Sequence, residues 1–327
     1  MSPSEEVLEP ALPICDPHHH LWDHPGRRYL LDELLGDTGS GHDVRATVFV
    51  ECLSMYRADG PAPLRPVGET EFVNGIAAMS ASGRYGPTRV AAGIVSFADL
   101  SLGEAVGAVL DAHLAASPRF RGIRHATAWD ASEAIRNAHT NPPAGLLGEA
   151  GFRRGFAELA RRRLTFDAWL YHPQIAELTA LARAFPDTTI VLDHFGGPLG
   201  IGPYQGRRAE VFAAWRSAVG TLAECPNVVA KLGGLVMPLN GFGFHKRAEP
   251  PSSTELAEAT RDWYLHTIDA FGVDRCMFES NFPVDKVSAS YRVLWNSFKR
   301  IAAKFSAAEK AALFHDTAAR VYRLGGG

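Results

Sequence analysis

Residues 12–22 read LPICDPHHHLW, so that a short apolar run leads directly into three consecutive histidines. Seven further short apolar runs, rich in β-branched residues, recur at a mean spacing of about 38 residues, which leaves room for one helix and two loops each time. Most are continuous rather than alternating, as is typical of strands buried on both faces of a parallel sheet. The eight predicted strands lie at 12–16, 46–51, 89–95, 120–124, 165–170, 189–193, 228–232 and 275–279.

Helical patterns fill most of the gaps between these runs. Two S-x-x-E capping boxes, Ser252 with Glu255 and Ser306 with Glu309, predict the starts of two late helices. Apolar residues also recur at helical spacing in three earlier segments. Those segments are 151–163, 175–185 and 209–222.

Eight strand-then-helix units without a linker favour an α/β fold, a parallel (β/α)8 TIM barrel that forms a single domain over residues 1–327. An open doubly wound sheet is the alternative. However, no G-x-G-x-x-G or P-loop motif follows the first run, so the usual nucleotide-binding signal of that fold is missing.

The composition is that of a globular protein, with 46% hydrophobic and 21% charged residues. Lys and Arg total 33 against 36 Asp and Glu, a net charge of −3, and we therefore expect neither nucleic-acid nor anionic-membrane binding. No apolar run reaches the roughly 20 residues of a membrane helix, and the acidic start does not resemble a secretory signal. With four scattered cysteines, these features predict a reduced, cytoplasmic protein.

Asp16, His18 and His20 alternate at the end of the first run. Because side chains along a strand alternate with a period of two, the three can face one side, with the two histidine Cα atoms about 6–7 Å apart. Neutral imidazole is the commonest metal ligand among side chains, so this pair could converge on one ion or one carbonyl oxygen. A chance run or a tag remnant is the alternative, but the histidines are framed by ICDP and LWD.

Further histidines stand at later strand ends: His172 in WLYHPQ and His194 in VLDHFGGP, with His125 a weaker case. Barrel active sites lie at the carboxyl ends of strands, so this recurrence favours a functional site over isolated structural histidines. The Gly-Gly-Pro after His194 predicts a tight turn. Two long loops, 125–149 and 233–253, also follow strand ends, and we expect each to be either part of the site or a surface insertion.

Six motifs, collinear over residues 16–286, together resemble the amidohydrolase superfamily, in the branch of lactonases and ACMS-type decarboxylases. Within that branch the chain is most similar to the group of 2-pyrone-4,6-dicarboxylate lactonase and sugar-lactone hydrolases. The resemblance implies a distorted (β/α)8 barrel and hydrolysis of a cyclic ester. The motifs are DPHHHLWD, FRGIRHA, FDAWLYHPQ, VLDHFGGP, VVAKLGGL and RCMFESNFPVDK.

Matched motif by motif, the resemblance implies a set of catalytic histidines that would also hold a metal where one binds. These are His18, His20 and His194. Arg124, after the fourth strand, would contact an anion or carbonyl of the substrate. His172 matches a fifth-strand position and Trp22 would form a wall against a substrate ring, so both are predicted to bind substrate.

The eighth strand departs from the family pattern. The branch usually has G-S-D-W-P there, with Asp as general base and frequent metal ligand, whereas this chain has ESNFP at 279–283 with Asn281 at the Asp position. An amide does not accept a proton at neutral pH. We therefore hypothesise that Glu279, on the same strand face, replaces the base, with Asp285 as second choice and Asn281 holding water or substrate. The alternative is that Glu279 pairs with an interior cation such as Lys231.

The favoured function is lactone hydrolysis, in which the histidines polarise the carbonyl, directly or through one divalent metal, and a carboxylate deprotonates water. Zinc is the first choice of metal, but Asn281 slightly favours a metal-independent enzyme. The alternatives are a metal-dependent decarboxylase or hydratase of an aromatic-type acid, and a barrel that binds without catalysis. We expect a small-molecule substrate, either a sugar-derived or a carboxylated lactone, and Arg124 favours a carboxylate. The sequence leaves open whether the protein forms a homo-oligomer.

Overall fold

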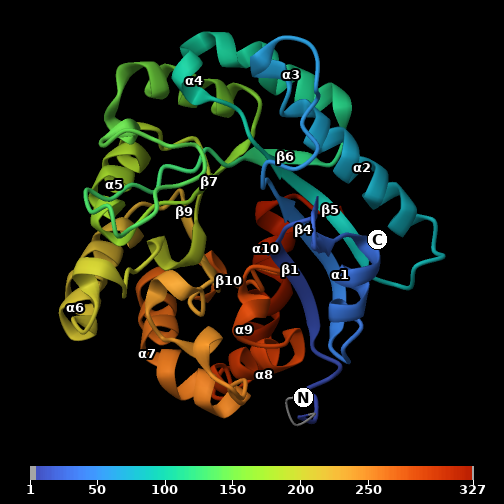
Figure 1. Cartoon of the computed structure of the whole chain (residues 1–327), viewed down its shortest axis with the longest axis vertical. Coiled ribbons are helices and arrows are strands. Elements are labelled where there is room, and N and C mark those ends of the chain that lie inside the picture. Colours follow the sequence, from blue (N-terminus) through green and yellow to red (C-terminus); the bar gives the residue numbers. More distant parts are fainter. Residues whose placement is uncertain (1–4, 326–327) are drawn as a thin grey trace.

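The computed structural model describes residues 5–325, in which one parallel eight-stranded sheet curls into a barrel surrounded by helices (Figure 1). The predicted fold class is confirmed, because each predicted run forms one strand and the spatial order follows the chain. The strands are β1 (Pro13–His19), β4 (Asp43–Val50), β5 (Arg89–Ser96), β6 (Phe120–Ile123), β7 (Thr165–Ala168), β8 (Ile190–Leu192), β9 (Val228–Leu232) and β10 (Cys276–Phe278).

The helices of the described residues cover the outside of the barrel (Figure 1). The three predicted helical segments correspond to α4, α5 and α6, and both predicted capping boxes are present, at the starts of α7 and α9. The α-helices are α1 (Leu31–Thr38), α2 (Val67–Ala81), α3 (Val106–Ala116), α4 (Ala150–Arg161), α5 (Ile175–Ala184), α6 (Arg208–Ala223), α7 (Ser253–Phe271), α8 (Tyr291–Ile301), α9 (Ala307–Ala311) and α10 (Thr317–Val321).

A small antiparallel hairpin that the sequence did not predict follows the first strand, formed by β2 (Trp22–His24) and β3 (Arg27–Tyr29). Gly26 in its turn has a φ of +73°, which glycine adopts without steric cost. The hairpin places Trp22 directly beyond the histidines at the end of β1.

Alternate residues of the strands divide the core into two parts. Ile190 belongs to the large apolar cluster packed against the helices, whereas its neighbour Val191 belongs to a smaller inner cluster that Tyr322 joins. By the same alternation Asp167 and Lys231 face the inside of the barrel, and both are fully buried. Charged groups thus lie directly beside the apolar inner cluster.

The barrel closes through backbone contacts at the predicted site. His19 and Phe282 form an isolated parallel bridge. The His20 N–H donates to the Phe282 carbonyl over 2.8 Å, and the Asn281 N–H donates to the His18 carbonyl over 3.0 Å. The ends of β1 and β10 are therefore joined by the segments that carry the candidate catalytic residues.

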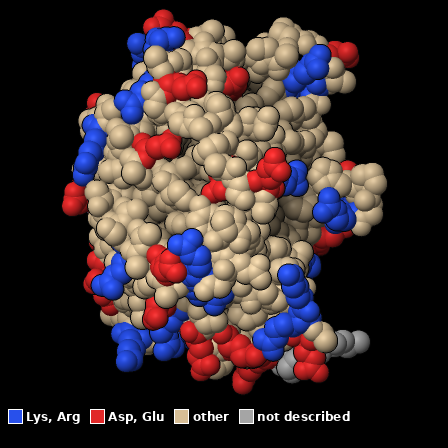
Figure 2. Space-filling model, turned by 60° about the vertical axis from the view of Figure 1, so that its left-hand side comes forward, with Lys and Arg blue, Asp and Glu red and all other residues tan. Residues whose placement is uncertain are grey.

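No helix within residues 5–325 has the length and apolar character needed to cross a membrane. Figure 2 shows one face of the molecule, on which Lys and Arg side chains are interspersed with Asp and Glu. The predicted cytoplasmic location, the expectation of no nucleic-acid partner and the open oligomeric state stay predictions.

Candidate active site

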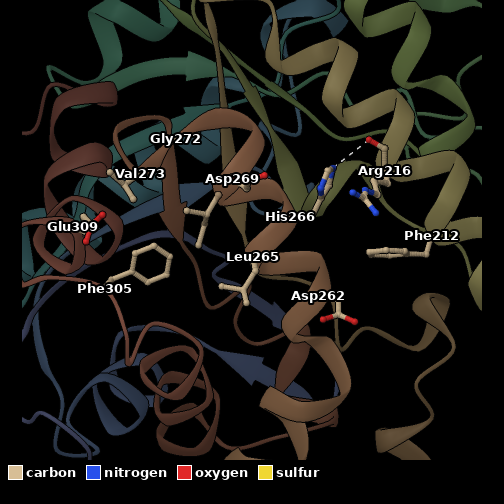
Figure 3. Close-up of a pocket in the computed structure, with 11 residues that line it drawn as sticks. Phe212, Arg216, Asp262, Leu265, His266, Asp269, Gly272, Val273, Phe305 and Glu309 are labelled. Carbon is tan, nitrogen blue, oxygen red and sulfur yellow. Dashed lines mark hydrogen bonds between the residues drawn. The ribbon is translucent and has the colours of Figure 1, made fainter.

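A wide hollow of about 820 Å³ lies outside the barrel, between α6, α7 and the segment that leads into α9 (Figure 3). Phe212, Leu265 and Phe305 contribute apolar side chains to it, and the His266 ring lies against the backbone carbonyl of Arg216, 3.2 Å from Nε2. None of the predicted site residues lines this hollow.

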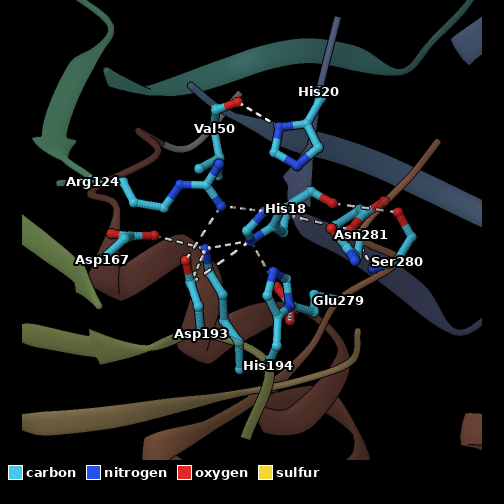
Figure 4. A network of polar contacts seen from close by, with 12 residues as sticks. His18, His20, Val50, Arg124, Asp167, Asp193, His194, Glu279, Ser280 and Asn281 are labelled. Carbon is cyan, nitrogen blue, oxygen red and sulfur yellow. Dashed lines mark hydrogen bonds and ion pairs between the residues drawn. The ribbon is translucent and has the colours of Figure 1, made fainter. Parts of the chain in front are cut away.

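The predicted histidines do meet at the carboxyl end of the barrel, around a network of buried polar contacts (Figure 4). The His18 ring centroid lies 4.4 Å from that of His194 and 5.0 Å from that of His20. His20 Nδ1 lies 2.8 Å from the Val50 carbonyl oxygen, which can only accept, so Nδ1 carries the proton. Burial lowers the pKa of His20 to about 3, which keeps this ring neutral.

His194 leaves β8 on a left-handed turn. Its φ is +51° and that of Phe195 is +59°, followed by Gly196 and Gly197, which also have positive φ. The predicted tight turn is therefore present and begins at the histidine itself. Non-glycine residues adopt this conformation at a cost, and such strain concentrates at functional sites.

The two glycines of VVAKLGGL, Gly233 and Gly234, make space for the site. A Cβ atom on Gly234 would lie 2.3 Å from His194 Nδ1, and one on Gly233 would lie 2.4 Å from Glu279 Cγ. Both approaches are closer than real Cβ contacts, so any larger residue would displace His194 or Glu279. The sequence after β9 thus has two glycines because the His194 side chain and the backbone and side chain of Glu279 occupy that volume.

Glu279 bridges two of the histidines. Its Oε1 lies 2.6 Å from His194 Nδ1 and its Oε2 lies 2.9 Å from His18 Nδ1. Burial raises the pKa of Glu279, but the contacts with His194 and His18 outweigh that effect and lower the pKa to about 2. A carboxylate accepts hydrogen bonds only, so His194 Nδ1 carries a proton and the Glu279 contact leaves Nε2 unengaged. Glu279 is placed to orient the rings.

A buried lysine lies directly beside His18. Lys231 Nζ is 2.7 Å from Asp167 Oδ2, 3.1 Å from Asp193 Oδ1 and 3.1 Å from His18 Nδ1. The Tyr322 hydroxyl donates to the same Asp167 oxygen over 2.6 Å. Burial lowers the pKa of Lys231, but Asp167 and Asp193 outweigh it and raise the pKa above its ordinary value. The hypothesised partner of Lys231, Glu279, contacts the histidines instead.

Arg124 lies on the Nε2 side of His18. Its Nε donates to Glu51 Oε1 over 2.7 Å and its Nη2 to the Glu51 carbonyl over 2.6 Å, so its charge is compensated within the protein. Its Nη1 lies 3.4 Å from His18 Nε2 and 3.8 Å from Asp193 Oδ2. His139, in the loop predicted at 125–149, lies 3.1 Å from Glu51 Oε2, which ties this loop to the site.

Asn281 and Asp285 form a separate buried pair. Asn281 Nδ2 donates to Asp285 Oδ1 over 3.1 Å, and Asn281 has a left-handed φ of +54°. Burial and the nearby charge of Glu279 raise the pKa of Asp285 well above its ordinary value. Asp285 therefore retains its proton more readily than an exposed carboxyl, and its contact is with the amide.

Two tryptophans border the histidines. Trp22 stacks on His20, with ring centroids 6.0 Å apart, and Trp169 meets His194 edge-on at 5.0 Å. His172, by contrast, accepts from the Leu199 N–H at Nδ1 over 3.3 Å. The His172 ring therefore binds the backbone of the loop that follows β8.

Three side chains could hold a metal ion: His18, Asp193 and His194 each offer one ligand atom, all within 4.8 Å of one another. Two imidazoles and a carboxylate are a set that zinc accepts. Both carboxylate oxygens of Asp193 are buried without a hydrogen-bond partner of good geometry, so they retain acceptor capacity. The residues therefore fit a divalent metal, with Asp193 in the set where His20 was predicted.

Residues 15–324 match the profile of the amidohydrolase family. The chain belongs to this family. The amidohydrolase is 36% identical to an uncharacterised protein of Sinorhizobium fredii, over 95% of this chain and 98% of that protein. It is 33% identical to an L-fucono-1,5-lactonase of Burkholderia multivorans, over 63% and 64% of the two chains.

Among solved structures, an amidohydrolase of Burkholderia multivorans is similar at 27% identity, with a TM-score of 0.71 over 95% of this chain and 99% of that one. A second crystal form of that protein contains zinc and has a TM-score of 0.70 over the same shares of the two chains. The family, the lactonase relative and this structural neighbour indicate a hydrolytic enzyme.

Proposed function

We propose that this amidohydrolase hydrolyses a lactone, the cyclic ester of a small acid. The observation that carries the proposal is the Glu279 carboxylate bound to Nδ1 of His194, which leaves the second nitrogen of a buried, oriented ring free for proton transfer. The relative named as an L-fucono-1,5-lactonase supports the same reaction class. Water attack on a ring ester needs such a base and a group that stabilises the developing oxyanion.

In the metal-free form His194 is the base. Glu279 holds His194 Nδ1–H, so Nε2 can take a proton from the attacking water, and the carboxylate stabilises the imidazolium that forms. When the tetrahedral intermediate collapses, the ring C–O bond breaks and the imidazolium returns the proton to the leaving alkoxide, which gives the open hydroxy acid. This assigns Glu279 an orienting role in place of the base role hypothesised from sequence, because both of its oxygens face histidine nitrogens. General-base help of this kind contributes about 10²–10⁴-fold.

Arg124 stabilises the oxyanion. Two of its nitrogens are engaged by Glu51, which fixes the guanidinium, while Nη1 is directed towards His18 and Asp193. A donor fixed in a buried site interacts most strongly with charge that appears during the reaction. Asn281, whose Nδ2 is engaged by Asp285, offers its carbonyl oxygen to orient water or a substrate hydroxyl.

Zinc is the proposed metal, held by His18, Asp193 and His194. When bound, it would supply Lewis acidity and an acidified water. Glu279 would then orient His194 as a ligand rather than as a base, in the way that carboxylates orient metal-bound histidines. His194 would therefore act as the base in the metal-free enzyme and as a ligand in the zinc-bound enzyme.

The substrate that the site supports best is a neutral, sugar-derived lactone. The two cations of the network are already paired, Arg124 with Glu51 and Lys231 with Asp167 and Asp193. A substrate carboxylate would have to compete with these buried partners, which favours the sugar-derived over the carboxylated of the two lactone classes expected from sequence.

The test is hydrolysis of a panel of sugar lactones and a pyrone dicarboxylate, before and after chelation. We expect turnover of at least one sugar lactone and a loss of about 10²-fold or more in His194→Gln. His266→Gln, in the outer hollow of Figure 3, is the matched control and should retain wild-type turnover. Absence of lactone turnover with release of CO2 from an aromatic acid would favour the decarboxylase, and tight lactone binding without turnover would favour a binding barrel.

A further inference from the structure

We propose that Lys231 is a built-in cation that competes with a divalent metal for Asp193 and His18, so that this site binds zinc weakly. The inference rests on the metal set of the proposed function, but it concerns occupancy rather than turnover. It starts from one distance: Lys231 Nζ lies 3.1 Å from donor atoms of both residues, Asp193 Oδ1 and His18 Nδ1.

A metal and the ammonium cannot use the same lone pairs. His18 Nδ1 can accept from Lys231 or donate to Glu279 Oε2, which lies 2.9 Å away, and a metal at that nitrogen would end both contacts. Metal bound through Asp193 Oδ1 would also place two like charges close together in a buried site, where screening by water is weak. Lys231 therefore opposes the metal by occupying the lone pair of His18 Nδ1 and by repulsion beside Asp193 Oδ1, with which it forms an ion pair.

The Lys231 ammonium is held in place by burial and by its contacts. Lys231 lies on β9 with no exposed side-chain surface, and its shortest contact is to Asp167 Oδ2 at 2.7 Å. Asp167 is in turn held by the Tyr322 hydroxyl, near the end of the chain. Figure 4 shows Asp167 and Asp193 directed towards the same position beside His18. The positive charge is thus fixed at the edge of the candidate metal set.

Two other features of the site also weaken zinc binding. Arg124 Nη1 lies 3.8 Å from the other oxygen of Asp193, so a second cation faces the single carboxylate of the set. After β10 this chain has Asn281, whose amide adds no negative charge to the site. Within the metal set, two cations therefore compete with a divalent ion for the single carboxylate of Asp193, while the nearby Glu279 carboxylate is engaged by His194 and His18.

The experiment measures zinc affinity on chelator-treated protein by competition with a fluorescent zinc chelator, with no substrate present. Wild-type protein should bind with a Kd weaker than about 1 μM. Lys231→Met should bind zinc at least about tenfold more tightly, because Asp193 and His18 lose their internal cation. Lys231→Arg, which retains the charge, should stay near the wild-type value. Tyr322→Phe, which changes the network without changing its charge, is the matched control.

A double variant guards against a folding defect. Lys231→Met leaves Asp167 without its partner, whereas Lys231→Met with Asp167→Asn removes both charges of the pair and keeps the shapes. The double variant should show the same gain in zinc affinity. Nanomolar binding by the wild type, or no gain in either variant, would overturn the proposal. Because no substrate is involved, a failure of the lactonase proposal would appear only in the turnover assay.

Discussion

Glu279 Oε1 lies 2.6 Å from Nδ1 of His194, and this contact joins the end of β10 to the left-handed turn after β8. The other carboxylate oxygen reaches His18 at the end of β1. One side chain thus ties together three strand ends that are far apart in sequence. The proposed chemistry of the site depends on this side chain although it is wholly buried.

Replacing Glu279 by Gln should reduce kcat by about 10²-fold or more, with a smaller change in KM, because the amide cannot stabilise a positive His194 ring. Steady-state kinetics on the best lactone of the panel measure both constants. Glu279→Asp, which keeps the charge on a shorter side chain, should retain more activity than Glu279→Gln. Equal kcat in wild type and Glu279→Gln would show that the carboxylate is only structural.

Gly234→Ala should reduce activity strongly and lower stability. The added Cβ would lie 2.3 Å from His194 Nδ1, and the φ of +71° is one that alanine adopts with strain of about 1 kcal/mol. Gly220→Ala on α6 is the matched control, because nothing lies within 4 Å of its Cβ and alanine favours a helix. Thermal unfolding and kcat should both fall for Gly234→Ala and neither should fall for Gly220→Ala.

Much of this arrangement could be predicted from the sequence, since strands buried on both faces appear as continuous apolar runs. The histidines were recognisable because they stand where such runs end, as His194 does after 189–193. The run 12–16 was only part of its strand, since β1 continues to His19, which pairs with Phe49 of β4.

The charged interior was harder to predict. Lys231 sits inside an apolar run and Asp193 ends another, and their spacing of 38 positions contains no sign that the two side chains meet. Only the register of β8 against β9, and the alternation that turns both side chains inwards, brings them together. A charged residue within an otherwise apolar strand was the available signal, because such a residue needs a buried partner.

Glu69→Gln should change how stability depends on pH. Glu69 is fully buried on α2 against the segment that follows β4, and burial, with the charge of Glu51, raises its pKa to about 8. A carboxyl with a raised folded pKa stabilises the fold below its unfolded pKa of about 4.5, and this contribution is lost as pH rises towards 8.

Unfolding by urea at several pH values tests this prediction. Between pH 5 and 8 the wild type should lose stability relative to Glu69→Gln, by at most about 1.4 kcal/mol per pH unit. The amide can still accept the Cys52 and Ser54 N–H groups that Glu69 Oε1 binds at 3.0 and 2.7 Å. Parallel stability curves for the two proteins would contradict the raised pKa.

Arg124→Lys should lower kcat/KM by about 10²-fold although the charge is retained. The guanidinium holds Glu51 with Nε and Nη2 and still directs Nη1 towards His18, and a single ammonium cannot reach both. Arg121→Lys on β6, three residues earlier, is the matched control, because the Arg121 guanidinium donates to the backbone carbonyls of Pro118 and Phe120. If Arg124→Lys and Arg121→Lys hydrolyse lactone equally well, charge alone suffices and the fork of the guanidinium has no part in stabilising the oxyanion.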